Sequence, residues 1–130
     1  MTRPAIGGIS PFFIVADMNA TLAFYRDRLG FEVTFVAESP GDPYFAIVRR
    51  DRAMIMLKAV EAPPLPNPRR DASARWDAYL DVPDPDALAA ELGSRGISFS
   101  VPLQDTHDGL RGFELEDVNG YVLFFGRPRA

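Results

Sequence analysis

Residues 17–31 read DMNATLAFYRDRLGF, and residues 84–97 read DPDALAAELGSRGI. Each stretch opens with an aspartate that can cap a helix and continues as an amphipathic run. A glycine then stands where the helix should end, and an apolar residue follows it. A strand-like apolar run precedes each stretch, at Ile9–Val15 and at Trp76–Val82. The sequence therefore predicts two copies of one β–α–β–β–β unit.

The composition is that of a soluble domain. The chain has 130 residues, 47% apolar and 25% charged, which is enough to bury one core. No apolar run approaches the ~20 residues that span a bilayer, and the first residues do not resemble a signal peptide. The absence of cysteine excludes disulfides and thiolate chemistry and fits a cytoplasmic location. A net charge of −4 disfavours nucleic acid and is compatible with a cationic ligand.

The duplication divides the chain into two modules of a single domain, residues 1–130. Module one is predicted over residues 5–61 and module two over residues 75–127. The segment between them, residues 62–74, contains so much proline that it can form neither a helix nor a ladder. We expect it to be an extended linker.

Strand candidates follow each predicted helix. In module one they are Phe31–Ala37, Tyr44–Arg49 and Met54–Val60, and in module two they are Ile97–Val101, Arg111–Glu116 and Tyr121–Gly126. A loop is expected through Gln104–Gly109. Asn119-Gly120, between the last two strands, is the strongest short hairpin signal in the chain.

Alternation along the strands assigns side chains to two faces. In the strand before the second helix, Trp76, Ala78, Leu80 and Val82 should pack under the helices, with Asp77, Tyr79 and Asp81 on the opposite face. That opposite face also carries apolar side chains: Phe12, Met54, Met56, Val122 and Phe124. A sheet that is apolar on both faces is covered on both, so we expect a ligand, a second subunit, or both there.

Several motifs resemble the vicinal oxygen chelate superfamily, which includes glyoxalase I, extradiol dioxygenases and bleomycin resistance proteins. These motifs are Val15-Ala16-Asp17, Phe24-Tyr25-Arg26-Asp27-Arg28-Leu29-Gly30-Phe31 and Phe113–Gly120. The resemblance covers essentially the whole chain. It implies an α+β fold in which two βαβββ modules form a cupped mixed sheet with helices on the outer face. In many members the complete cup forms across a homodimer.

The metal enzymes of that superfamily carry histidine and glutamate ligands at fixed strand positions. Here the resemblance places Ser10, Asp77, Phe124 and Met56 at those positions. Only Asp77 could ligate a divalent ion, and one carboxylate does not hold a transition metal. We therefore expect no metal, no other cofactor and no catalytic residue of the metal-enzyme type.

The metal-free bleomycin resistance proteins are the branch that the chain resembles most. They bind a cationic glycopeptide in grooves of a homodimer and inactivate it by sequestration. The expected ligand-binding residues here are Phe12, Met54, Met56, Asp77, Tyr79, Glu114 and Phe124. Aromatic rings would stack on the ligand, methionines would adapt to its shape, and Asp77 would meet a cationic or hydroxylated group. Trp76, by contrast, is expected in the core.

Three functions stay open at this point. The first is a metal-free protein that sequesters an amphiphilic small molecule, such as an antibiotic. The second is a glyoxalase- or dioxygenase-like metalloenzyme with displaced ligands, drawn from His107, Asp77, Glu114 and Glu116. The third is a metal-free enzyme or a small regulatory module whose cup serves assembly. His107, the one histidine, lies in an acidic loop that is typical of a solvated turn or a ligand-gating loop.

Overall fold

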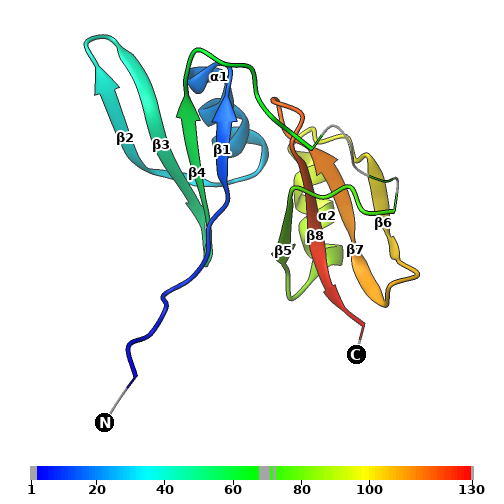
Figure 1. The fold of residues 1–130 in the computed structure, drawn as a ribbon. Coiled ribbons are helices and arrows are strands. Elements are labelled where there is room, and N and C mark those ends of the chain that lie inside the picture. The colour runs from blue at the N-terminus through cyan, green and yellow to red at the C-terminus, as the bar shows by residue number, and fades with distance from the viewer. Residues whose placement is uncertain (1–2, 68–70, 72, 130) are drawn as a thin grey trace.

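The computed structural model describes residues 3–67, 71 and 73–129, which form eight strands, two α-helices and one π-helical turn (Figure 1). The first half contains β1 (Phe12–Val15), α1 (Met18–Ala23), η1 (Phe24–Arg28), β2 (Glu32–Ser39), β3 (Asp42–Arg50) and β4 (Ala53–Ala59). The second contains β5 (Ala78–Asp81), α2 (Pro85–Ser94), β6 (Val101–Asp105), β7 (Leu110–Glu116) and β8 (Val122–Pro128). The predicted duplication is confirmed. Residues 68–70 and 72 of the predicted linker lie outside the described residues.

Both predicted helix starts are confirmed. The Asp17 carboxylate accepts the backbone N–H of Ala20, and the Asp84 carboxylate accepts that of Ala87, as capping aspartates do. The first helix changes into the π-helical turn η1 and ends before Gly30, whose φ is +72°. No helix within the described residues is long and apolar enough to cross a membrane.

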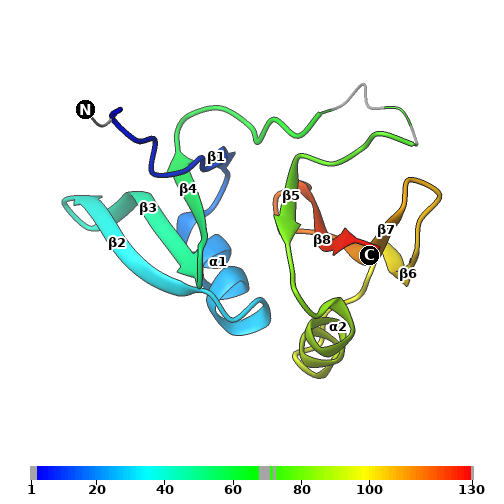
Figure 2. The ribbon, with the colours of Figure 1, turned by 90° about the horizontal axis from the view of Figure 1, so that it is seen from below.

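Each module forms a four-stranded mixed sheet with the same topology. The strand orders are β1-β4-β3-β2 and β5-β8-β7-β6, and in each sheet only the first pair is parallel. Both helices lie on one side of the sheets, and the described parts of the connecting segment, residues 60–67 and 73–77, lie on the other side (Figure 2). We call the sheet surface away from the helices the non-helix face.

The two-module arrangement of sheets and helices is the predicted α+β fold. No ladder joins β1 to β5 within the described residues.

Two predicted strands begin at least three residues later in the structure. The strand predicted from Ile9 begins only at Phe12, and residues 3–10 form an extended arm. The strand predicted over residues 97–101 is β6, which begins where that range ends. The physical reason is that the N–H of Ile97 still bonds to the carbonyl of Leu92 in the last turn of α2. The chain therefore joins the sheet later than its β-branched residues indicate.

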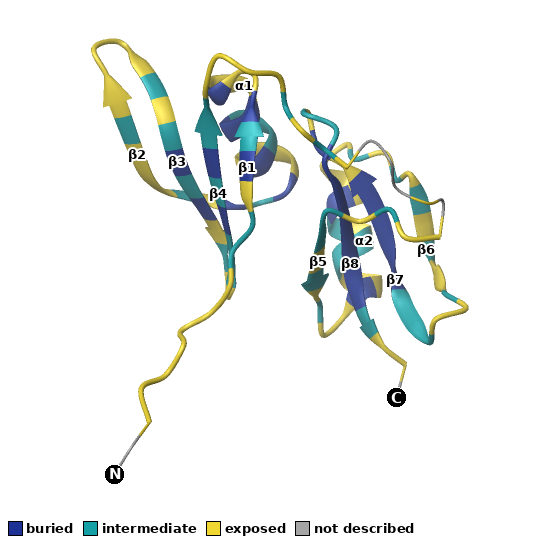
Figure 3. Cartoon of the chain, in the orientation of Figure 1, coloured by how far each residue is buried: buried dark blue, intermediate teal, exposed yellow. Residues whose placement is uncertain are grey.

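The buried side chains of the two modules form one core. Phe13 of β1 stacks on Tyr121 with ring centroids 4.1 Å apart, and the Tyr121 hydroxyl donates to the carbonyl of Ile14. Tyr25, fully buried, donates from its hydroxyl to Asp117 Oδ2 over 2.7 Å. Figure 3 shows burial concentrated along β7 and β8, with exposed residues along the arm and β2. Aromatic and polar contacts near the β7–β8 turn therefore join the modules.

The Tyr25–Asp117 hydrogen bond should contribute measurably to stability. Burial raises the pKa of Asp117, and the Tyr25 hydroxyl opposes that shift because it stabilises the ionised carboxylate. Tyr25→Phe leaves a buried oxygen without this donor, which should cost about 1–3 kcal/mol and raise the pKa of Asp117 further. Chemical denaturation measures the cost. Tyr44→Phe, at an exposed ring, is the matched control and should change little. Equal stability of the two variants would show that the hydrogen bond is dispensable.

Candidate functional site

The non-helix face of the first sheet carries an exposed apolar surface. Phe12 lies beside Met56 in the β1–β4 register, and 58% of Phe12 is exposed. The Phe12 ring contacts Phe45, which in turn contacts Phe35 in an edge-on arrangement. Met54, half-buried, has its sulfur 3.2 Å from a guanidinium nitrogen of Arg49. The predicted residues of this module therefore share one open surface.

The non-helix face of the second sheet is hollowed by two glycines. Gly112 and Gly126 lie opposite each other in the β7–β8 register. A Cβ at Gly112 would lie 2.7 Å from Phe124 Cζ, and a Cβ at Gly126 would lie 2.6 Å from Phe124 Cε2. The Phe124 ring therefore lies flat over two residues that have no side chain. It is only 2% exposed, although it faces away from the helices.

Trp76 covers Phe124, so the prediction that it packs in the core under the helices is wrong. The Trp76 and Phe124 rings are stacked, with centroids 4.1 Å apart and planes 21° apart. Trp76 precedes β5, so strand alternation does not fix its direction, and a flat aromatic surface was available beside it. It is 36% exposed.

Tyr79 completes a layer of three nearly parallel rings. It is paired with Phe124 in the β5–β8 register and stacks beside it, with planes 13° apart. Its hydroxyl donates to the carbonyl of Gly126 over 3.1 Å. Burial and the nearby Asp81 carboxylate raise the pKa of Tyr79, so the phenol stays neutral. We call Trp76, Tyr79 and Phe124 the aromatic platform. Because Trp76 and Tyr79 are 36% and 41% exposed, it can stack on a flat ligand group.

Glu114 lies on the same face but is held within the protein. Its carboxylate accepts from Arg75 Nε over 3.0 Å and from the Ser100 hydroxyl over 2.9 Å. The side chain of Glu114 is only 3% exposed, and Arg75 also approaches Glu116 at 3.8 Å. A buried carboxylate needs such partners. Glu114 therefore helps to hold Arg75 and the adjacent Trp76 in place. The charge of the Glu114 carboxylate is already compensated by Arg75.

Asp77 is also engaged by the backbone. Its Oδ2 accepts the N–H of Val122 over 2.8 Å, and its Oδ1 accepts that of Asn67 over 3.3 Å. The backbone N–H of Asp77 donates to the carbonyl of Val122. These bonds fasten the connecting segment to the start of β8. Asp77 directly follows Trp76, so its hydrogen bonds to the backbone help to fix the positions of Trp76 and Tyr79.

The residues at the metal positions of the superfamily do not fit a metal ion. Phe124 and Met56 offer no oxygen ligand, and the Asp77 carboxylate is occupied by backbone N–H groups. No group of three or more His, Asp or Glu side chains within the described residues could hold an ion. His107, with an 80% exposed side chain, pairs with its neighbour Asp108 at 3.2 Å. It lies at the surface.

Sequence reasoning missed Trp76, Gly112 and Gly126. The two glycines carried a usable signal, because glycine inside a strand often marks a close approach by another group. Both fall at positions whose side chains would point to the non-helix face, Gly126 on the strand of Phe124 and Gly112 on the neighbouring β7. No sequence signal placed Trp76 over Phe124, because its position depends on the path of the connecting segment.

The chain matches a family model over residues 8–125. The description of that model is Glyoxalase/Bleomycin resistance protein/Dioxygenase superfamily. No curated protein matches the chain.

Similar solved structures cover nearly the whole chain. The bleomycin-binding protein of bleomycin-producing Streptomyces verticillus, complexed with copper(II)-bleomycin, is 26% identical. Its TM-score is 0.69, over 99% of this chain and 100% of that one. TioX of Micromonospora sp. ML1 is 19% identical, with a TM-score of 0.70 over 91% and 94% of the two chains. The antibiotic-binding protein TnmS3 of Streptomyces sp. CB03234 is 18% identical, with a TM-score of 0.65 over 98% of both chains. At these identities TioX and TnmS3 show the fold alone.

Proposed function

Because the chain belongs to the Glyoxalase/Bleomycin resistance protein/Dioxygenase superfamily, we propose that it binds and sequesters an aromatic small molecule without using a metal. The aromatic platform carries the proposal: two exposed rings stacked on a third, beside an open strand edge at β5. A protein that is 26% identical over its full length is complexed with copper(II)-bleomycin, which makes an antibiotic with flat rings the first ligand to test. Sequestration of such a compound would confer resistance to it.

Some site residues would contact the ligand, and others would hold those residues in place. Trp76 and Tyr79 would stack on the ligand, and Phe124 backs them from beneath. Glu114 and Asp77 would act indirectly, through Arg75 and through the fastening of the connecting segment. Phe12, Met54 and Met56 lie on the other sheet and would form the opposite wall of a cup. The rings of the platform are uncharged, and the nearby carboxylates of Glu114 and Asp77 already have hydrogen-bond partners. We therefore expect aromatic stacking, more than charge, to provide the affinity.

A ligand titration with metal analysis tests the proposed function. Protein purified without added metal should contain well under one zinc, iron, nickel or manganese ion per chain. A bleomycin-type glycopeptide or another flat aromatic antibiotic at about 100 times its Kd should stabilise the fold by about 2.7 kcal/mol. This corresponds to a melting temperature roughly 5–10 °C higher. A thiol–dicarbonyl adduct is the control ligand and should give no shift. One tightly held ion per chain, or a shift with the adduct alone, would contradict the proposal.

We also propose that the chain acts as a two-fold homodimer. Its accessible surface is 8128 Å², whereas a compact monomer of 14.4 kDa is expected to expose roughly 6,800 Å². The excess includes the extended arm, where Ile6 and Ile9 are 90% and 95% exposed, and Phe12 at the start of β1. A second copy would cover these side chains and bring the open non-helix face of one module toward the other module of its partner.

Light scattering at micromolar concentration tests the assembly. We expect the mass of a dimer, and we expect Ile6→Ser with Ile9→Ser to shift it toward the monomer because both apolar anchors are lost. Val118→Ser is the control, since it removes an exposed apolar side chain from the β7–β8 turn, away from the arm. A monomeric mass of the parent protein would refute the dimer.

A further inference from the structure

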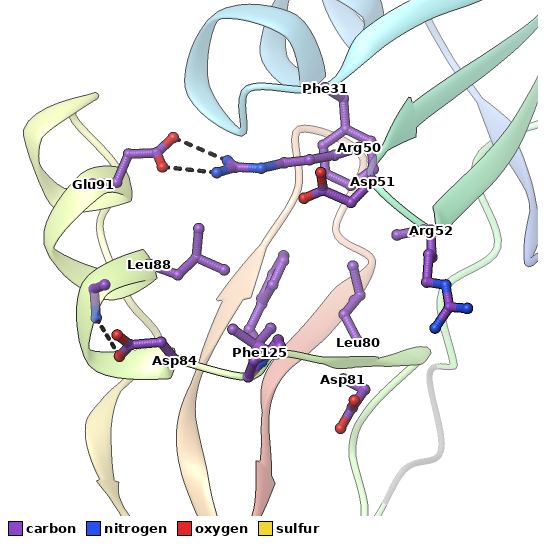
Figure 4. Close-up of a pocket in the computed structure, with 14 residues that line it drawn as sticks. Phe31, Arg50, Asp51, Arg52, Leu80, Asp81, Asp84, Leu88, Glu91 and Phe125 are labelled. Atoms are coloured by element: carbon purple, nitrogen blue, oxygen red, sulfur yellow. Dashed lines mark hydrogen bonds and ion pairs between the residues drawn. The ribbon is translucent and has the colours of Figure 1, made fainter.

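A cavity lies on the helix side of the molecule, between the modules. Its volume is about 520 Å³, within the usual range for small-ligand sites. One wall is the β3–β4 turn, residues 50–53, and the other is formed by β5, residues 82–84 and α2. We call it the seam cavity. Its floor is apolar: Leu80, Leu88 and Phe125 project into it (Figure 4).

Negative side chains outnumber positive ones around the seam cavity. Four carboxylates and two guanidinium groups line it, which gives a net charge of −2. The Arg50 guanidinium is already bound by Glu91, with contacts of 2.7 and 3.0 Å, and Arg52 lies at the opposite side of the cavity from Glu91 and Leu88 (Figure 4). The Arg50 cation is thus already paired, and the net negative charge of the lining disfavours an anionic ligand inside the cavity.

Asp51 contributes one of these carboxylates, beside Arg50 at the β3–β4 turn. It forms no ion pair with any of the described residues, and its carboxylate points to the space above the apolar floor (Figure 4). Its φ of +52° fixes it at the tip of the β3–β4 turn, a conformation that aspartate and asparagine tolerate. An ionised carboxylate over an apolar surface favours a cationic group attached to an apolar body.

We propose that the seam cavity is a second binding site, for a small organic cation whose apolar body rests on Leu80, Leu88 and Phe125 and whose charge meets Asp51. This site is separate from the aromatic platform, because Leu80 and Phe125 face the helices whereas Tyr79 and Phe124 face the other way. The inference does not depend on the proposed function, and either can fail alone.

Three probes of equal shape test the site: 4-phenylbutylamine, 4-phenylbutanol and 4-phenylbutyrate, titrated into the full chain and followed by the backbone resonances of ¹⁵N-labelled protein. The amine should shift the resonances of Asp51, Leu80 and Leu88 most, the alcohol should bind more weakly at the same place, and the carboxylate should not bind. Asp51→Asn should weaken the amine about threefold to tenfold and leave the alcohol unchanged, because the site is partly exposed. Leu88→Ala should weaken the amine and the alcohol alike.

Two controls separate this site from the rest of the molecule. Asp42→Asn removes an exposed carboxylate at the other end of β3 and should change no affinity. Trp76→Ala disrupts the aromatic platform and should also leave amine binding intact. Carboxylate binding as tight as that of the amine, or an unchanged amine affinity in Asp51→Asn, would overturn the proposal. So would amine binding that appears only after removal of residues 3–9, since the seam would then hold the arm of a second copy.

Discussion

Trp76→Ala should weaken a flat aromatic ligand by about tenfold to a hundredfold. The substitution removes the exposed upper ring of the platform, which lies 4.1 Å from Phe124. A lost stacking partner costs about 0.5–1.5 kcal/mol beyond its area, and the lost apolar contact adds a similar amount. Together these give about 1–3 kcal/mol, a range that includes the stated loss of affinity.

Isothermal titration of the parent and the variant measures this effect. Trp76→Phe should recover most of the affinity, because a smaller ring can still stack. Tyr44→Ala is the matched control: Tyr44 is similarly exposed but lies on β3 of the first sheet, whereas the platform lies on the second sheet. Equal affinity of Trp76→Ala and parent for a verified ligand would remove the platform from the binding site.

Gly112→Ala should destabilise the protein by about 3 kcal/mol. A Cβ at this position would lie 2.7 Å from Phe124 Cζ and 2.8 Å from Gly126 Cα, and it would collide with the carbonyl oxygen of Phe125. Two of these neighbours are backbone of the central strand β8, which cannot withdraw without breaking its ladders on both sides. The Phe124 ring would also be lifted toward Trp76.

The matched control for Gly112→Ala is Gly93→Ala. Gly93 lies inside α2, and a Cβ there would meet only Phe99 at 4.0 Å. Alanine should therefore stabilise this helix by roughly 0.5–1 kcal/mol. Denaturant melts of the two variants should shift in opposite directions. A Gly112→Ala variant as stable as the parent would mean that Phe124 does not lie in a tight hollow.

Local sequence patterns predicted the fold well. The capping aspartates Asp17 and Asp84 and the alternation of Tyr79 with Leu80 each depend on neighbours within a few residues. Such signals can be read from the sequence because all the residues that take part are close together in the chain. The duplication predicted that both modules would share one topology, because each must bury the same kind of helix against the same kind of sheet.

The candidate site was less predictable because it depends on contacts across long sequence separations. Glu114 was expected to bind the ligand, but its carboxylate is paired with Arg75, 39 residues away in the sequence. Trp76 appeared to be a strand residue under the helices, but the connecting segment turns its ring onto Phe124. The seam cavity depends on the packing of the β3–β4 turn against α2, which neither module encodes alone.

Fluorescence of Trp76 tests the central claim most directly, because Trp76 is the one tryptophan of the chain. The protein would be titrated with a bleomycin-type glycopeptide and with other flat aromatic antibiotics, while calorimetry records binding in the same samples. We predict a saturable change in Trp76 emission with one of these compounds, with the affinity given by calorimetry and a stoichiometry of one ligand per chain. Binding detected by calorimetry with unchanged Trp76 emission would contradict the account, as would an absence of binding across the whole panel.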